Sequence, residues 1–259
     1  MSPEPPRPTS PTSRPALWES SAANPGFPAD PFGIWPPPGR PLFCGASVFL
    51  LAPCEALRHN GAMAKLYFSY AAMNAGKSTL LLQAAYNYRE RGMRPLLYTS
   101  ALYAENGVGL ISSRIGISEP ASLYSASDDL YQSIRDEQEI GKVDCVFVDE
   151  AQFLTPEQVW QLARVSDRLR IPVMCFGLRT DFQGKLFPGS SELLAVADTL
   201  REIRTICECG AKATMVVRQS ADGRVITAGE QVSIEKSVYI SLCRRHWEEA
   251  VGRWPVKGP

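Results

Sequence analysis

The sequence predicts an α/β fold: a parallel sheet with helices on both faces, followed by a small β domain. From Met63 onward, short apolar runs alternate with helical segments, as in a sheet built from β-α-β units. Beyond about Thr205, this alternation gives way to short strand-like runs on either side of an Asp-Gly turn. We therefore predict two folded regions, residues 63–204 and residues 205–250, with a tail over 251–259.

The first 62 residues differ in composition from the rest of the chain. They hold 14 of the 21 prolines and show no sustained strand or helix period, so we expect a disordered extension over 1–62. An apolar stretch at 42–52 has the length of a signal-peptide core, but it lies far from the N-terminus. Met63 stands just before the first expected strand, and we expect translation of the native protein to begin there.

The bulk composition excludes several classes of protein. Lys+Arg and Asp+Glu both number 27, so the net charge gives no general attraction to nucleic acid. The 7 cysteines are too few for a disulfide scaffold. Because no run approaches the roughly eighteen apolar residues of a membrane span, we expect a cytoplasmic protein with neither a membrane nor a nucleic-acid partner.

The first element pair is a strand that breaks into a Gly-Lys-Ser turn and a helix. The strand is expected over 65–70, and the helix over about 78–91, with Gly92 as its stop. In such a turn, backbone N–H groups cradle the phosphates of ATP, while Lys77 reaches the β/γ oxygens and Ser78 binds Mg²⁺. A chance surface turn is the alternative, because Ala71 stands where the usual pattern begins with glycine. The expected phosphate-loop residues are Ala71, Ala72, Met73, Asn74, Ala75, Gly76, Lys77 and Ser78.

Two adjacent carboxylates provide the second signal. A strand over 95–100 and a helix near 127–139 lead to a buried-type strand over 143–148, which ends in Asp149 and Glu150. Ligands of open α/β sheets bind outside the carboxyl ends of the strands, so both acids should face the phosphate loop. Asp149 would then hold Mg²⁺ and Glu150 would be free for proton chemistry. A solvated acidic turn is the alternative interpretation.

The remaining elements follow from local signals. Thr155, Pro156 and Gln158 form a capping box with proline at the first helical position, and that helix should run to about Arg170. A buried-type strand is expected over 171–178 and a short helix over about 190–197. Beyond these, strands over 214–218 and 224–227 flank the turn at 220–223, which predicts a hairpin.

Three cysteines and one histidine bracket this hairpin. Cys207 and Cys209 precede the 33 residues from 210 to 242, and Cys243 and His246 follow them. Thiolate and imidazole ligands suit a tetrahedral Zn²⁺, and four protein ligands would make the metal structural. A small β domain with little apolar material also needs such a staple. Free buried cysteines and a surface histidine are the alternative.

Four motifs together resemble the type II thymidine kinases, the cytosolic and bacterial class. They are the phosphate-loop run 71–79, the run 148–153, the run 177–182 and the C-x-C/C-x-x-H pair. They occur in the order found in that family and cover nearly everything from Met63 to about Ala250. Members of the family tolerate a small residue at the first glycine position, which accounts for Ala71.

The resemblance implies a RecA-like P-loop domain, a zinc-stapled domain with a lasso loop, a homotetramer and feedback inhibition by thymidine triphosphate. It implies transfer of the ATP γ-phosphate to the 5′-hydroxyl of thymidine, a nucleotide-salvage reaction, with ATP and Mg²⁺ as cofactors and Glu150 as general base. The implied ATP-binding set adds Asp149, Glu150, Ala151 and Gln152 to the phosphate loop. The implied nucleoside-binding residues, whose apolar members are also explicable as ordinary core, are Phe153, Leu178, Phe182, Val232, Ser233, Ile234 and Tyr239.

The chain departs from the family pattern in two places. The family usually carries an Asp-x-Arg stretch after the second strand, whereas residues 101–106 hold neither the aspartate nor the arginine. Arg114 or Arg179 could compensate, or activity could be weak. In the expected lasso, the run 235–237 replaces common glycines, which could alter loop closure.

Two other functions compete with the kinase. The first is a P-loop ATPase whose zinc ribbon binds nucleic acid, which requires a basic face on that ribbon. The arginines between Cys207 and Trp254 are offset by acidic residues, which disfavours it. The second is a non-catalytic nucleotide-binding regulator, suggested by the missing Asp-x-Arg.

Overall fold

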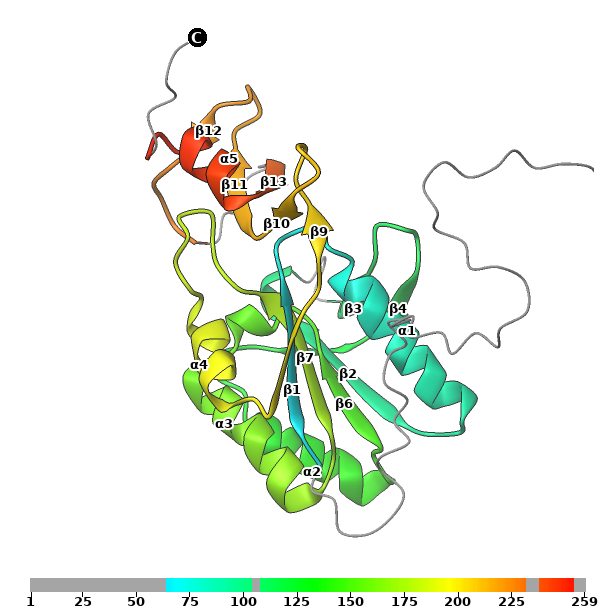
Figure 1. The fold of residues 1–259 in the computed structure, drawn as a ribbon. Helices are drawn as coiled ribbons and strands as arrows, with labels where there is room; N and C mark the ends of the chain where they lie inside the picture. Colours follow the sequence, from blue (N-terminus) through cyan, green and yellow to red (C-terminus); the bar gives the residue numbers. More distant parts are fainter. Residues whose placement is uncertain (1–63, 104–107, 232–237, 254–259) are drawn as a thin grey trace, which may run out of the picture. The chain divides into compact units, whose positions relative to one another are not determined.

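The computed structural model describes residues 64–103, 108–231 and 238–253 (Figure 1). All of these residues fall within one unit of the chain, Phe49–Pro259. Among them, none of the helices combines the length and apolar character needed to cross a membrane.

A six-stranded sheet organises the residues up to Glu202. Every pair of neighbouring strands is parallel, which confirms the predicted parallel sheet. The carboxyl ends of the strands therefore lie along one edge. Across the sheet, the order is β5 (Ser122–Tyr124), β2 (Pro95–Ser100), β6 (Cys145–Val148), β7 (Val173–Leu178), β1 (Leu66–Ala71) and β8 (Thr199–Glu202).

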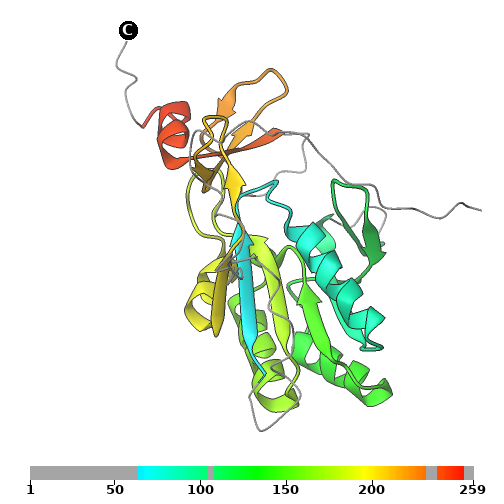
Figure 2. The ribbon, with the colours of Figure 1, turned by 45° about the vertical axis from the view of Figure 1, so that its right-hand side comes forward.

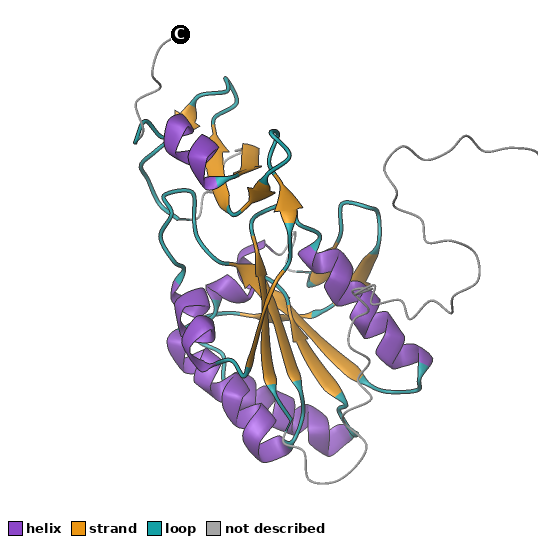
Figure 3. Ribbon diagram, in the orientation of Figure 1, coloured by secondary structure: helices purple, strands orange, loops and turns teal. Residues whose placement is uncertain are grey.

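Helices cover both faces of this sheet, as predicted (Figure 3). One face carries α1 (Lys77–Glu90), and the other carries α2 (Leu130–Ile140), α3 (Pro156–Arg164) and α4 (Pro188–Val196). Successive side chains of β6 pack against the helices on opposite faces of the sheet. Cys145 and Phe147 pack with α1, whereas Val146 and Val148 pack with the other three helices. The continuous apolar run of β6 is thus explained by burial on both sides.

Local sequence sets the ends of the helices. The Thr155 hydroxyl accepts the Gln158 N–H at 3.2 Å, and the Gln158 side chain accepts the Thr155 N–H at 3.1 Å, which confirms the capping box. The helical path continues beyond α3 as one turn of π-helix, η5 (Val165–Leu169). Arg170 ends it with a left-handed backbone of φ 59°. Gly92, at φ 68°, ends α1 as predicted.

The structure contains short elements that the sequence pattern does not predict. A hairpin of β3 (Leu110–Ser112) and β4 (Ser118–Pro120) packs Ile111 against α1. Strands β5 and β8 extend the sheet at its two edges, and a short 3-10 helix, η2 (Ala101–Tyr103), follows β2. Strands of three or four residues are too short to show a hydrophobic period.

We call the described residues from Thr205 to Arg253 the C-terminal lobe (Figure 2). In it, β11 (Met215–Gln219) and β12 (Val225–Ile226) form the predicted hairpin, and β13 (Val238–Leu242) pairs with the other side of β11. The buried Trp247 side chain packs with Val217 and Leu242 in a small core. The other elements of the lobe are β9 (Thr205–Ile206), β10 (Lys212–Ala213) and α5 (Arg244–Ala250).

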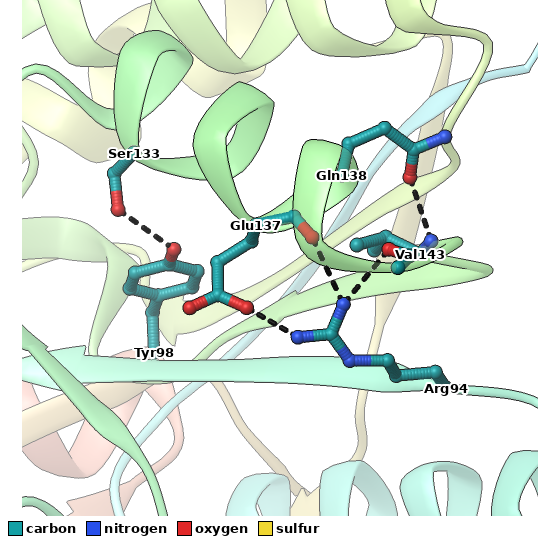
Figure 4. Close-up of polar contacts among 7 residues, drawn as sticks. Arg94, Tyr98, Ser133, Glu137, Gln138 and Val143 are labelled. Carbon is teal, nitrogen blue, oxygen red and sulfur yellow. Dashed lines mark hydrogen bonds and ion pairs between the residues drawn. The ribbon is translucent and has the colours of Figure 1, made fainter.

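Arg94 joins the start of β2 to the end of α2 (Figure 4). Its Nη1 donates to the carbonyl oxygens of Glu137 at 3.0 Å and Gly141 at 2.8 Å, and its Nη2 pairs with the Glu137 carboxylate. Carbonyls at a helix C-terminus lack helical partners, so a cation there is favourable. Further along the same elements, the Tyr98 hydroxyl lies 3.0 Å from Ser133 Oγ. These contacts fix α2 on the sheet.

Gly189 allows α4 to pack closely on the turn η4 (Ala151–Phe153), which follows the paired acids. An added Cβ would lie 2.6 Å from the Leu154 carbonyl oxygen and 2.7 Å from that of Ala151. We therefore expect Gly189→Ala to lower the free energy of unfolding by about 1–3 kcal/mol, because backbone atoms would have to shift. Urea denaturation measures this loss.

Gly141→Ala is the matched control for that substitution. Its added Cβ would meet only Arg94 Nη1, at an ordinary 3.7 Å, and its backbone is extended. We expect a change within about 0.5 kcal/mol. Equal stability of the two variants would contradict the close packing of α4 on η4.

Candidate active site

The phosphate loop connects β1 to α1. Asn74 at φ 60° and Gly76 at φ 80° both have left-handed backbones, which turn the chain sharply before the helix. Lys77, the first residue of α1, is buried, and its Nζ donates to the Ala72 carbonyl at 3.2 Å. The first N–H groups of a helix have no helical partners, and this end of α1 therefore favours an anion.

The structure brings Asp149 to this loop. The Ser78 hydroxyl donates to Asp149 Oδ2 at 2.9 Å, although the two residues are 71 positions apart. Asp149 follows β6, Ser78 is the second residue of α1, and both lie at the carboxyl edge of the sheet. A hydroxyl and a carboxylate side by side are oxygen ligands of the kind that Mg²⁺ prefers. The described residues therefore fit a Mg²⁺-nucleotide at this edge.

Burial dominates the electrostatics of the pair Lys77 and Asp149. It raises the pKa of Asp149, as does the neighbouring Glu150 charge, to about 7 despite the Ser78 hydrogen bond and the Lys77 charge. Burial also lowers the pKa of Lys77, against the attraction of Glu150 and Asp149. Burial thus disfavours the charged form of each group. Shifted pKa values gathered in one place are typical of functional sites.

Glu150 lies in a tight turn between β6 and η4. Its backbone is left-handed, with φ 53°, which is uncommon for a residue with a side chain. Gln152 Nε2 donates to Glu150 Oε2 at 2.5 Å, and Gln152 Oε1 accepts the Leu178 N–H at 2.9 Å. The Gln152 side chain thus orients the Glu150 carboxylate against the end of β7.

Tyr124 is a site residue that the sequence analysis did not identify. Its hydroxyl donates to the Glu150 carbonyl at 2.8 Å, so it supports the left-handed turn. Tyr124 is buried at the end of β5, which pairs with β2 and so reaches the same edge as β6. Only the strand order brings it there, and no local motif marks it.

The expected nucleoside residues lie in two groups. Phe153 and Leu178 lie at the carboxyl edge of the sheet near Glu150, and the Phe153 ring packs edge-on against Phe187 at 5.8 Å between centroids. Phe182 instead lies at the C-terminal lobe, buried beneath the Arg218 guanidinium at 4.3 Å. Tyr239, in β13, accepts a 3.4 Å hydrogen bond from Asn74 at its carbonyl.

Three of the expected nucleoside residues lie outside the described part of the chain: Val232, Ser233 and Ile234. Five expected phosphate-loop and ATP-site residues remain. Ala71 ends β1, Ala72, Met73 and Ala75 lie between β1 and α1, and Ala151 begins η4 after β6.

The four metal-ligand candidates of the C-terminal lobe come together. Their ligand atoms all lie within 4.8 Å of one another, with Cys207 Sγ 3.3 Å from His246 Nδ1 and Cys209 Sγ 3.9 Å from Cys243 Sγ. With Zn–S bonds of about 2.3 Å in a tetrahedron, the sulfur atoms are about 3.8 Å apart. The cluster Cys207–Cys209–Cys243–His246 is therefore compatible with structural zinc.

The environment of Cys207 favours a thiolate ligand. Burial opposes ionisation, but the backbone N–H groups of Cys209 and Cys243 and the His246 ring outweigh it, and they lower the pKa of Cys207 to about 6. Thiolates rather than thiols bind metal ions.

Comparison with known proteins gives one family. A family model described as thymidine kinase matches residues 64–247. Thymidine kinase of Mesorhizobium japonicum is 65% identical over 191 residues, which cover 74% of this chain and 94% of that protein. Thymidine kinase of Ruegeria pomeroyi is 62% identical over 197 residues, with 76% of this chain and 100% of that protein covered. Thymidine kinase of Photobacterium profundum is 55% identical, with 74% and 100% covered. The chain belongs to the thymidine kinase family.

Proposed function

We propose that this protein transfers the γ-phosphoryl group of ATP to the 5′-hydroxyl of thymidine, in nucleotide salvage. The observation that carries the proposal is the 2.9 Å contact between Ser78 and Asp149, which joins the phosphate loop to the paired acids at one edge of a parallel sheet. The nucleoside and the reaction are inferred from the name thymidine kinase, which the family model and the three relatives described above all carry.

The chain's own residues bind and neutralise the triphosphate. In this proposal the N-terminus of α1 and the loop N–H groups hold the phosphates, and Lys77 neutralises the β/γ oxygens. Mg²⁺, when bound, would supply further charge neutralisation at those oxygens. Ser78 and Asp149 are the residues that would hold it.

Glu150 is the proposed general base. As the 5′-oxygen forms its bond to the γ-phosphorus, the bond from phosphorus to the ADP oxygen breaks, and the hydroxyl proton passes to the Glu150 carboxylate. Phosphoryl transfer needs positioning more than covalent help, and the Gln152 hydrogen bond at 2.5 Å supplies it for this carboxylate.

Phe153, Leu178 and Tyr239 are proposed to bind the nucleoside, because they lie near Glu150 or contact the phosphate loop. Phe182 is proposed to support these residues without touching the nucleoside, because the Arg218 guanidinium already covers its ring. The same proposal includes Val232, Ser233 and Ile234, as a lasso carried by the zinc-stapled lobe. The proposal also includes four features that the resemblance to type II thymidine kinases implies. They are a RecA-like domain over 63–204, a zinc domain over 205–250, a homotetramer and feedback inhibition by thymidine triphosphate.

Turnover of labelled thymidine with ATP and Mg²⁺ tests the function. We expect labelled thymidine monophosphate, formed only when both ATP and the divalent cation are present. Nucleotide binding without any turnover would instead favour the regulator. ATP hydrolysis stimulated by nucleic acid, without a phosphorylated nucleoside, would favour the ATPase.

A further inference from the structure

We propose that Ser241 is a positioning residue that sets the geometry of the phosphate loop, so that the C-terminal lobe governs nucleotide affinity. The inference rests on the function proposed above, in which this loop binds ATP. Ser241 itself lies in β13, on a different part of the fold from the loop, and none of the roles assigned above uses its side chain.

Two successive loop residues are held by β13. The Ser241 hydroxyl donates to the Met73 carbonyl at 2.5 Å, across 168 positions in sequence. The Asn74 side chain donates to the Tyr239 carbonyl at 3.4 Å, which is a longer and weaker contact. Met73 and Ser241 are both half-buried, so water competes less for the shorter bond.

The contact between Ser241 and the Met73 carbonyl affects phosphate binding through the geometry of the peptide bond that follows Met73. In a trans peptide, the carbonyl of one residue and the N–H of the next point in opposite directions. Since the Met73 carbonyl points to Ser241 in β13, the Asn74 N–H must point away from β13. The left-handed backbone of Asn74, with φ 60°, costs free energy and needs support from its surroundings. Ser241 therefore fixes the direction of one of the N–H donors of the phosphate loop.

The strand that carries Ser241 is a rigid base for this contact. It pairs with β11 from Val238 to Leu242, and the next residue, Cys243, belongs to the metal-ligand cluster. A second bridge runs beside it, because Arg179 Nη2 donates to the Thr214 carbonyl at 3.3 Å at the end of β7. The metal-ligand cluster is thus joined through β13 to the phosphate loop.

The test compares Ser241→Ala with Ser241→Thr, which keeps the hydroxyl and suits a strand. We expect Ser241→Ala to weaken binding of a non-hydrolysable ATP analogue about three- to tenfold, the range for one lost hydrogen bond. The KM for ATP should rise in parallel, while kcat at saturating ATP stays within about twofold, because Ser241 touches no reacting atom. Ser241→Thr should bind nearly as tightly as the wild type. Val238→Ala, an exposed change on the same strand, is the control.

Calorimetric titration of full-length, zinc-loaded protein measures these affinities, with metal content and melting temperature recorded for every variant. Failure of the wild type to bind the analogue would refute the proposed function itself. Wild-type binding with unchanged affinity in Ser241→Ala would overturn only the role of Ser241. If Ser241→Ala lost metal or stability, Ser241→Val would decide, since it has the shape of Ser241→Thr but lacks the hydroxyl. Equal affinity in Ser241→Val and Ser241→Thr would then overturn the proposal.

Discussion

Glu150→Gln is expected to lower kcat for thymidine phosphorylation at least about 10²-fold while ATP still binds. Glutamine has nearly the same shape as glutamate but cannot accept the 5′-hydroxyl proton. The turn should survive, because the Tyr124 hydroxyl donates to the backbone carbonyl of residue 150 and not to its side chain. Steady-state kinetics with labelled thymidine, together with ATP-analogue binding, separate the two effects.

Glu157→Gln provides the matched control for this experiment. Glu157 lies on the first turn of α3 and pairs with Arg164 at 2.9 Å on the surface. The same chemical change there should leave kcat within about twofold, since exposed ion pairs contribute little. Near-normal turnover in Glu150→Gln would rule out the general-base role, whatever the control shows.

Cys207→Ser is expected to abolish stoichiometric zinc binding and to unfold the C-terminal lobe. The lobe buries only a small apolar core around Trp247, so metal binding has to provide much of its folding free energy. Structural zinc sites of this kind supply roughly 10 kcal/mol or more in apparent binding free energy at neutral pH. Metal analysis by mass spectrometry and hydrogen exchange in β11 and β13 measure the two losses directly.

Cys175→Ala serves as the control, because Cys175 is buried in β7 and lies outside the cluster. We expect it to lose only about 1 kcal/mol of stability, through the small cavity left behind, and to keep its zinc. A Cys207→Ser protein with full zinc content and an unchanged lobe would show that the cluster is not a metal site.

Much of the fold is predictable from local signals. The run from Val146 to Val148 is buried on both faces because β6 is central, and its β-branched and aromatic composition is typical of such a strand. The capping box at Thr155 and the stop at Gly92 depend on residues close in sequence, so local patterns predict both correctly. The strands at the two sheet edges are not predictable in this way, because three or four residues carry no measurable period.

The candidate site is predictable where a motif carries its chemistry in consecutive residues. Lys77, Ser78 and Asp149 are such cases, and the structure brings the last two into contact. Tyr124 and Ser241 act on backbone carbonyls 26 and 168 positions away, so only tertiary structure reveals them. Phe182 is hard to assign for a different reason. Its residue type fits a wall that stacks on a base, but the sequence does not reveal that Arg218 covers the ring, because that contact depends on packing.

The indole of Trp247 provides a built-in optical probe at the junction between the sheet domain and the C-terminal lobe. Its N–H donates both to the Phe182 carbonyl at 3.2 Å and to the Val216 carbonyl at 3.0 Å, so each side of the junction contributes one acceptor. Trp160, in contrast, is 46% exposed on α3. Replacing it and the tryptophans at 18, 35 and 254 by phenylalanine leaves Trp247 as the single tryptophan of the chain. Tryptophan emission would then follow opening of this junction in real time, without an attached dye.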